Sequence, residues 1–140
     1  MDYKLELVLI PVSDVDRAKK FYLERAGFVL IVDTPIGEGM RVVQLTPRGS
    51  ECAIGFGTGL TPSAAGSAKG LHLVVSDILA ARAELVERGL AVSEVRHLES
   101  GTWVDGPHPE RSNYESFADF SDPDGNLWML QEVDRSKAGT

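Results

Sequence analysis

Three polar side chains interrupt apolar runs of this sequence, where they can carry chemistry. His72 stands in LHLVV, Asp119 in FADF and Gln131 in LWMLQE. An imidazole near neutrality can give and take a proton, so His72 is a candidate acid or base. A carboxylate in an apolar strand needs a partner or a raised pKa, which makes Asp119 a second candidate catalytic group. The Gln131 amide cannot do acid/base work, but it can fix a ligand carbonyl or amide.

Each of these residues also has a structural interpretation. His72 can be hydrogen-bonded across a sheet, Asp119 can lie at a sheet edge, and Gln131 can satisfy a neighbour. Other chemistry is not indicated. No GxSxG motif is present, and GFGTGL precedes a linker instead of opening a helix. The single cysteine, Cys52, lacks an obvious activating base, and its apolar surroundings predict a buried thiol.

Length and charge limit the kinds of partner. The 140 residues suit one compact domain with a substantial core. The formal net charge of −7 argues against nucleic acid and anionic membranes as partners, because both are bound through basic patches. The apolar run Leu7–Ile10 is far too short to span a bilayer and no signal peptide is visible. We therefore expect a cytoplasmic protein.

The elements that would position these side chains occur twice. Val12–Arg25 (VSDVDRAKKFYLER) aligns without gaps with Val75–Arg88 (VSDILAARAELVER), and six positions are identical. An apolar run precedes each motif and further apolar runs follow it. The Ser-Asp pair supplies acceptors for the first N–H groups of a helix, while Gly27 and Gly89 mark the helix ends. This similarity indicates two copies of one supersecondary unit.

Each copy has the pattern of a βαβββ unit, so the predicted fold class is α+β. The strands expected after each helix are residues 28–33, 40–46 and 52–56 in the first copy, and 91–97, 114–120 and 127–133 in the second. The predicted organisation is a first module at about 4–57, a linker at 58–69, a second module at about 70–133 and a polar tail at 134–140. A helix covers only one face of each sheet, so two modules are expected to enclose a ligand cleft.

The second copy contains a long loop, ESGTWVDGPHPERSN (residues 99–113), where the first has only TPIGEG. Long irregular loops in compact domains often act as lids or binding loops. Trp103 is a large aromatic residue in this polar stretch, so a ligand, a dimer partner or its own domain is expected to cover it. His108 in the same loop is expected to be exposed, and Trp128 is expected in the core.

The paired units, with PVSDVDRAKKFY, ERAGF and FSDPDGNLWMLQE, resemble the vicinal oxygen chelate superfamily. This group includes glyoxalase I, bleomycin resistance proteins and extradiol dioxygenases. The resemblance covers about residues 4–133. It implies two βαβββ modules whose curved mixed sheets surround a cleft, and it implies a homodimer. The fold hosts many chemistries, so the resemblance does not define a reaction.

The resemblance also indicates where a metal would bind. Metal-dependent members carry His, Gln or Glu ligands on the first and last strands of each module. Those positions correspond here to Leu7 and about Ala53, and to Gly70 and Met129. None supplies a hard oxygen or nitrogen donor, since a thioether suits soft ions. No cofactor is therefore expected. A divalent metal would require displaced ligands, for which the candidates are His72, Gln131, Asp119 and Gln44.

Two classes of function remain open. The first is a metal-independent protein that sequesters a small hydrophobic or amphipathic molecule, as bleomycin resistance proteins do. The second is a lyase, isomerase or dioxygenase of the superfamily, with a displaced metal or with metal-free acid/base chemistry at His72 and Asp119. Residues two apart share a strand face. With the strand orientation that the resemblance implies, the candidate ligand contacts are Leu7, Leu9, Gln44, His72, Trp103, Phe117, Met129 and Gln131.

We predict that Ni, Zn, Mn, Fe(II) or Co in excess leaves the melting temperature of chelator-stripped protein unchanged. A cation that binds only the folded state must raise that temperature, because it adds RT ln(1 + [L]/Kd) to the free energy of unfolding. A rise of several degrees that disappears in His72→Ala would instead establish a displaced metal site.

Overall fold

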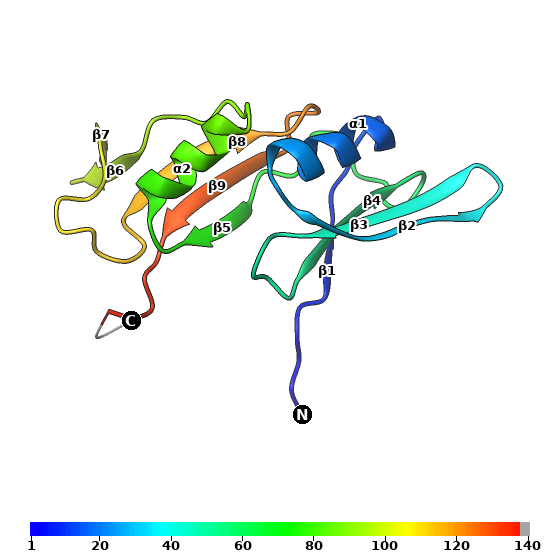
Figure 1. Ribbon diagram of the computed structural model, residues 1–140, viewed down its shortest axis with the longest axis horizontal. Helices are drawn as coiled ribbons and strands as arrows, with labels where there is room; N and C mark the ends of the chain where they lie inside the picture. The colour runs from blue at the N-terminus through cyan, green and yellow to red at the C-terminus, as the bar shows by residue number, and fades with distance from the viewer. Residues whose placement is uncertain (138–140) are drawn as a thin grey trace. The chain divides into compact units, whose positions relative to one another are not determined.

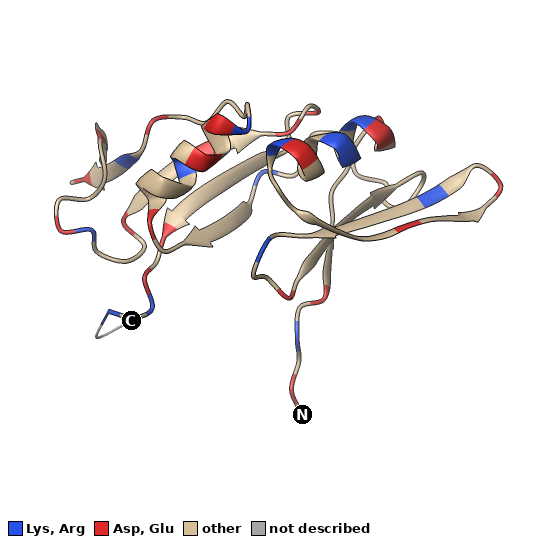
Figure 2. Ribbon diagram, in the orientation of Figure 1, with Lys and Arg blue, Asp and Glu red and all other residues tan. Residues whose placement is uncertain are grey.

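The computed structural model describes residues 1–137, so the last part of the predicted polar tail, 138–140, lies outside the described residues. The backbone divides into two units. Unit 1 comprises residues 1–69 together with 122–126, and unit 2 comprises residues 70–121 and the described residues from Leu127 onward. Lys, Arg, Asp and Glu lie mainly on helices and connecting segments, and β4 and β5 carry none (Figure 2).

Unit 1 is a four-stranded mixed sheet in the order β1-β4-β3-β2, with β1 parallel to β4 and the other pairs antiparallel (Figure 1). Its helical segment packs on one face, where the Tyr22 ring lies 5.8 Å from that of Phe56. Its elements are β1 (Leu7–Leu9), α1 (Val15–Lys20), the π-helix η1 (Phe21–Arg25), β2 (Val29–Gly37), β3 (Met40–Thr46) and β4 (Ala53–Gly57).

Unit 2 is a five-stranded mixed sheet in the order β5-β9-β8-β6-β7, with β5 parallel to β9. The two mixed sheets with few helices confirm the predicted α+β class. Buried side chains of β8 and β9, such as Phe120 and Trp128, form the core, as expected for Trp128. The elements are β5 (Leu71–Val75), α2 (Ile78–Glu87), β6 (Arg96–Glu99), β7 (Thr102–Asp105), β8 (Ser116–Ser121) and β9 (Leu127–Glu132).

Both helices start where the sequence indicates. The Asp14 carboxylate accepts a hydrogen bond from the Arg17 N–H at 3.0 Å, and Asp77 accepts one from Ala80 at 3.2 Å. These are N-cap bonds to otherwise unpaired backbone groups. The first helix changes its hydrogen-bond pattern at Phe21, however. The Ala26 N–H donates to the carbonyl five residues back, so η1 has the wider π pattern.

The second copy departs from its predicted strands at two places. The strand expected at residues 91–97 begins only at Arg96. In the stretch before it, the Arg82 guanidinium donates to the Ser93 and Val92 carbonyls at 2.7 and 3.2 Å. The expected irregular loop instead contains β7. Its turn is a Ser-Gly pair, residues 100–101, in which both residues have positive φ (50° and 80°), as a two-residue hairpin turn requires.

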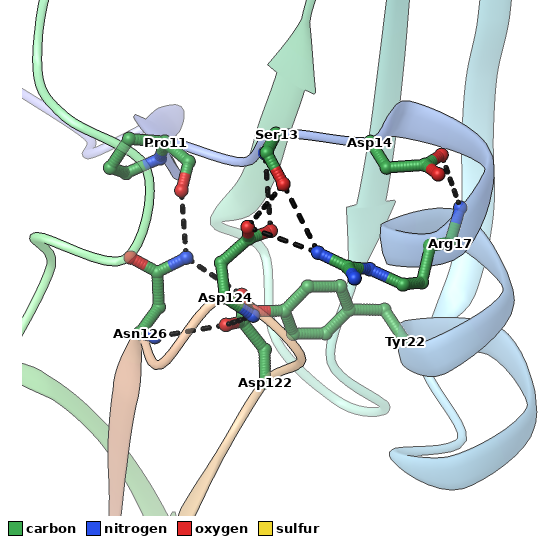
Figure 3. A network of polar contacts seen from close by, with 8 residues as sticks. All are labelled: Pro11, Ser13, Asp14, Arg17, Tyr22, Asp122, Asp124 and Asn126. Carbon is green, nitrogen blue, oxygen red and sulfur yellow. Dashed lines mark hydrogen bonds and ion pairs between the residues drawn. The ribbon is translucent and has the colours of Figure 1, made fainter.

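The turn between β8 and β9, residues 122–126, belongs to unit 1 because its side chains bind the segment before α1 and η1 (Figure 3). The Asp122 carboxylate accepts hydrogen bonds from the Tyr22 hydroxyl at 2.8 Å and from the Asn126 amide at 2.7 Å. The same amide donates to the Pro11 carbonyl at 2.8 Å. Tyr22 and Asn126 are fully buried, so these bonds replace water for polar groups in the core.

A second carboxylate of the turn reaches the start of α1. Asp124 accepts from the Ser13 hydroxyl at 2.5 Å and pairs with Arg17 at 3.1 Å (Figure 3). The linker also packs against this turn at Gly66. The contact is so close that a Cβ at Gly66 would lie 2.1 Å from the Asp124 carbonyl oxygen. The turn therefore serves as a polar anchor for three segments of unit 1.

Removing the Tyr22 hydroxyl should weaken this anchor. We expect Tyr22→Phe to lower the free energy of unfolding by about 1–3 kcal/mol, because a buried carboxylate loses one of its donors. Urea denaturation measures the change. Tyr3→Phe is the matched control, since Tyr3 is 91% exposed, and it should have almost no effect. Equal losses in the two variants would contradict the anchoring role.

Candidate functional site

The open face of the unit 1 sheet, opposite α1 and η1, brings three predicted residues together. Leu9, Gly55 and Gln44 form one row across β1, β4 and β3. Gly55 has no side chain, and its neighbours lie over it. A Cβ there would be 3.0 Å from Leu7 and 3.5 Å from both Leu9 and Gln44. Leu7, Leu9 and Gln44 therefore surround one position on an otherwise apolar surface.

The open face of the unit 2 sheet, opposite α2, carries the remaining candidates, and all of them except Trp103 lie in two rows. The first row is His72, Met129 and Asp119 on β5, β9 and β8. The second row is Gln131, Phe117 and Arg96 on β9, β8 and β6. Neighbouring side chains in each row are within contact distance, because residues opposite each other on adjacent strands have Cβ atoms about 4.5–5.5 Å apart.

The two candidate catalytic residues do not contact each other. His72 and Asp119 lie on strands separated by β9, which places their backbones about 10 Å apart with Met129 between them. The Asp119 carboxylate is instead paired with the Arg96 guanidinium at 2.7 Å. His72 is exposed, and no side chain among residues 1–137 makes a hydrogen bond to its ring. Asp119 thus has in Arg96 the charged partner that a carboxylate in an apolar strand requires.

Trp103 stands on β7 beside this ion pair. The Arg96 guanidinium carbon lies 4.7 Å from the centre of the Trp103 ring, within range of a cation–π interaction. Phe117 meets the same ring edge-to-face, with centroids 5.6 Å apart. Trp103 is still 48% exposed, so its own unit covers it only in part. Gln131, the last candidate of this face, donates to the Tyr114 carbonyl at 3.2 Å.

Arg96 is a member of this face that the sequence reasoning missed. The alternation that reveals it is a feature of the structure, in which His97 of β6 is buried and Arg96 is not. Alternation of this kind places neighbouring side chains on opposite faces of a strand.

The strand register refines the comparison between modules. Leu9 pairs with Gly55, and His72, the equivalent of Leu9 in the repeat, pairs with Met129. Gly55, and not Ala53, is therefore the equivalent of Met129. Neither supplies a hard oxygen or nitrogen donor. Within residues 1–137, no group of three or more His, Cys, Asp or Glu side chains is placed to hold a metal ion.

A buried histidine outside these faces was also missed. His97 is 3% exposed, with Nδ1 at 2.7 Å from the Gly106 carbonyl and Nε2 at 3.0 Å from Glu99. Both partners are acceptors, so both bonds form together only when the ring is protonated. The bond to the Gly106 carbonyl and the bond to the Glu99 carboxylate raise the pKa of His97. His108 packs edge-to-face on this ring at 6.0 Å and is half-buried, so its expected exposure was wrong.

Comparisons with known proteins agree with this architecture. Residues 4–130 match the model of the Glyoxalase/Bleomycin resistance protein/Dioxygenase superfamily, so the chain belongs to this superfamily. The resemblance expected from the sequence is thereby confirmed. No helix among residues 1–137 has the length and apolar composition needed to cross a membrane.

Two solved structures from Streptomyces sp. CB03234 are similar to this chain. The first is TnmS3, an antibiotic binding protein, with 35% identity, a TM-score of 0.72 and coverage of 94% of this chain and 96% of that one. The second is a glyoxalase/bleomycin resistance protein, with 36% identity, a TM-score of 0.69 and coverage of 91% and 99%. A curated relative, the uncharacterized protein YetH of Bacillus subtilis, is 24% identical over 89% of this chain and 94% of its own length.

His97 should make the stability of unit 2 depend on pH. Its pKa is raised on folding, so its stabilising contribution is complete below the ordinary histidine value of about 6.5 and is lost as pH rises through the raised value. We expect Glu99→Gln to lower the pKa of His97 in an NMR titration. The difference in melting temperature between the wild type and this variant should shrink from about pH 6 to about pH 9. Glu115→Gln, at an exposed carboxylate, is the control and should change neither quantity.

Proposed function

We propose that the protein binds a small hydrophobic or amphipathic molecule on the open sheet face of unit 2 and sequesters it, as a resistance protein does. One observation carries the proposal. The open face of unit 2 combines the apolar side chains of Trp103, Phe117 and Met129 with the polar groups of His72 and Gln131. Apolar area with a few oriented polar groups is the usual composition of a small-molecule site.

The similarity to an antibiotic binding protein supports the same function. That relative is 35% identical over nearly the whole of both chains. The arrangement of the polar residues favours binding over acid/base chemistry, because Asp119 is ion-paired and lies two strands from His72. We also infer a homodimer from membership of the superfamily.

Tryptophan fluorescence offers a direct test with bleomycin and a panel of aromatic antibiotics. The chain has two tryptophans, and Trp128 is 2% exposed, so a ligand on the open face of unit 2 should change the emission of Trp103. We expect at least one compound to bind and to be recovered chemically unchanged by mass spectrometry. Recovery of a converted product would establish an enzyme instead.

Matched charge substitutions locate the site. Met129→Lys places an ammonium group on the open face, where a bound apolar ligand would desolvate it, so affinity should fall by about tenfold or more. Leu79→Lys is the control. Leu79 is 45% exposed and lines a separate hollow of about 340 Å³ beside α2. Equal weakening by the two substitutions, or loss of binding only with Leu79→Lys, would rule out the open face as the binding surface.

A further inference from the structure

The hairpin formed by β6 and β7 is attached to the rest of unit 2 over a short length. In the described part of the chain, two residues of β6, Arg96 and His97, pair with β8. The residues that follow, 98–103, extend beyond this ladder and include the hairpin turn. β7 lies at the edge of the sheet, beside β6. Contacts made by side chains of the hairpin therefore matter for the order of its tip.

The His97 side chain ties the tip of this hairpin to its base. Its Nδ1 lies 2.7 Å from the carbonyl oxygen of Gly106, the residue that follows β7, and its Nε2 lies 3.0 Å from the Glu99 carboxylate beside the turn. Gly106 also donates its N–H to the Val95 carbonyl at 2.8 Å. The base is thus fixed through the backbone, and the ring bridges this fixed base and the tip.

The bridge is complete only when the imidazole is protonated. A carbonyl oxygen and a carboxylate are both acceptors, and a neutral ring has a single N–H to donate. When the proton leaves, the bond to Gly106 persists, because the backbone holds that residue in place. The Nε2 lone pair then repels the Glu99 carboxylate, whose side chain is 57% exposed and can turn into water. The tip thereby loses its connection to the ring.

The loop after β7 places a second imidazole against the first. The His108 ring packs edge-to-face on that of His97, with centroids 6.0 Å apart. The His108 Nδ1 accepts the backbone N–H groups of Glu110 and Ser112 at 3.2 and 3.3 Å. In this arrangement the proton of His108 is therefore on Nε2, and the ring adds no positive charge beside His97.

The other elements on this face direct no further charge at the His97 ring. Its register partners are Val104 on β7 and Ser116 on β8, and both are uncharged. On α2, the Arg82 guanidinium is engaged by the carbonyls of residues 92–93 and by Glu94. Glu99 is thus the charged partner whose contact changes when His97 gains or loses its proton.

We propose that His97 is a proton-dependent clamp, closed when the protonated ring holds the tip of the β6–β7 hairpin to its base and open when the neutral ring releases Glu99. The tip forms one end of the open face of unit 2, because Leu98 and Trp103 pair with each other there and are 42% and 48% exposed. Binding on that face is therefore tighter when the clamp is closed. This last step rests on the proposed function, whereas the clamp itself does not.

The direction of the pH dependence follows from the two bonds of the ring. The bond to the Gly106 carbonyl and the bond to the Glu99 carboxylate raise the pKa of His97 above its ordinary value of about 6.5. The clamp is therefore closed below that ordinary value, and it opens as pH rises through the raised one.

The clamp is tested in ligand-free protein labelled with 5-fluorotryptophan. The chain has two tryptophans, so the fluorine NMR spectrum has two signals, which Trp103→Phe assigns. We expect the Trp103 signal to narrow between about pH 6 and about pH 9 as the tip becomes mobile, with its midpoint at the pKa of His97. The signal of the buried Trp128 should keep its width. A Trp103 signal of constant width would overturn the clamp.

Glu99→Gln is the matched variant. The new amide can donate to the Nε2 of a neutral ring while the Nδ1–H stays on the Gly106 carbonyl, so the clamp should remain closed and the Trp103 signal should lose its pH dependence. The chain has three histidines, and the controls His72→Asn and His108→Asn should keep the wild-type dependence. A dependence lost in His108→Asn and kept in Glu99→Gln would overturn the proposal. Circular dichroism melting confirms that each variant is folded.

The link to binding is tested with 8-anilinonaphthalene-1-sulfonate, a hydrophobic dye whose sulfonate stays ionised over the same pH range. We expect its affinity for the wild type to fall by about fivefold or more as the clamp opens, and to stay constant in Glu99→Gln. By reciprocity, saturating dye should raise the pKa of His97 in the wild type. Met129→Glu, which places a carboxylate on the open face, should weaken the dye throughout.

The outcomes separate this inference from the proposed function. If the Trp103 signal titrates with His97 and no antibiotic of the panel binds, the clamp stands and the proposed function fails. If antibiotics bind and the Trp103 signal does not change with pH, sequestration stands and the clamp is overturned. If the dye binds independently of pH, or as tightly to Met129→Glu as to the wild type, the link between the clamp and binding is overturned.

Discussion

The parallel pairing of the first and last strands in each unit is the constraint on which the candidate site depends. In unit 1 it places Leu9 beside Gly55, and in unit 2 it places His72 beside Met129. A register shift of one residue would move the open-face side chains of a strand to the helix face, because the side-chain period of a strand is two. The antiparallel neighbours then extend the rows to Gln44 and Asp119.

Paired charges hold the segments around this frame. Glu132 lies on the helix face of β9 and is 2% exposed. It accepts a hydrogen bond from the first N–H of α2, at Ile78, and pairs with Arg111 in the loop before β8. A buried carboxylate without such partners would be costly, so each buried charge also determines where a loop lies. The turn at residues 122–126 plays the same part in unit 1.

The two faces of each sheet differ in chemistry. The helix faces contain the buried polar networks that stabilise each unit, and the open faces contain few charges, of which Arg96 and Asp119 neutralise each other. At the strand positions that correspond to metal ligands in metal-dependent members, this chain has leucine, alanine, methionine or glycine. The open faces are thus suited to contact an apolar molecule, with polar groups that orient it.

The sequence by itself determined the features that depend on local periodicity and backbone chemistry. The repeat, both helix starts at Asp14 and Asp77, and the strand faces of Met129, Gln131 and Trp128 were all predictable, because a cap or a period of two acts within a few residues. Only the tertiary structure decided that Gly55 matches Met129, that Arg82 donates to the Ser93 carbonyl, and that Asp119 pairs with Arg96 and not with His72. These outcomes depend on strand register and on contacts between distant residues, for which no local pattern in one sequence carries a signal.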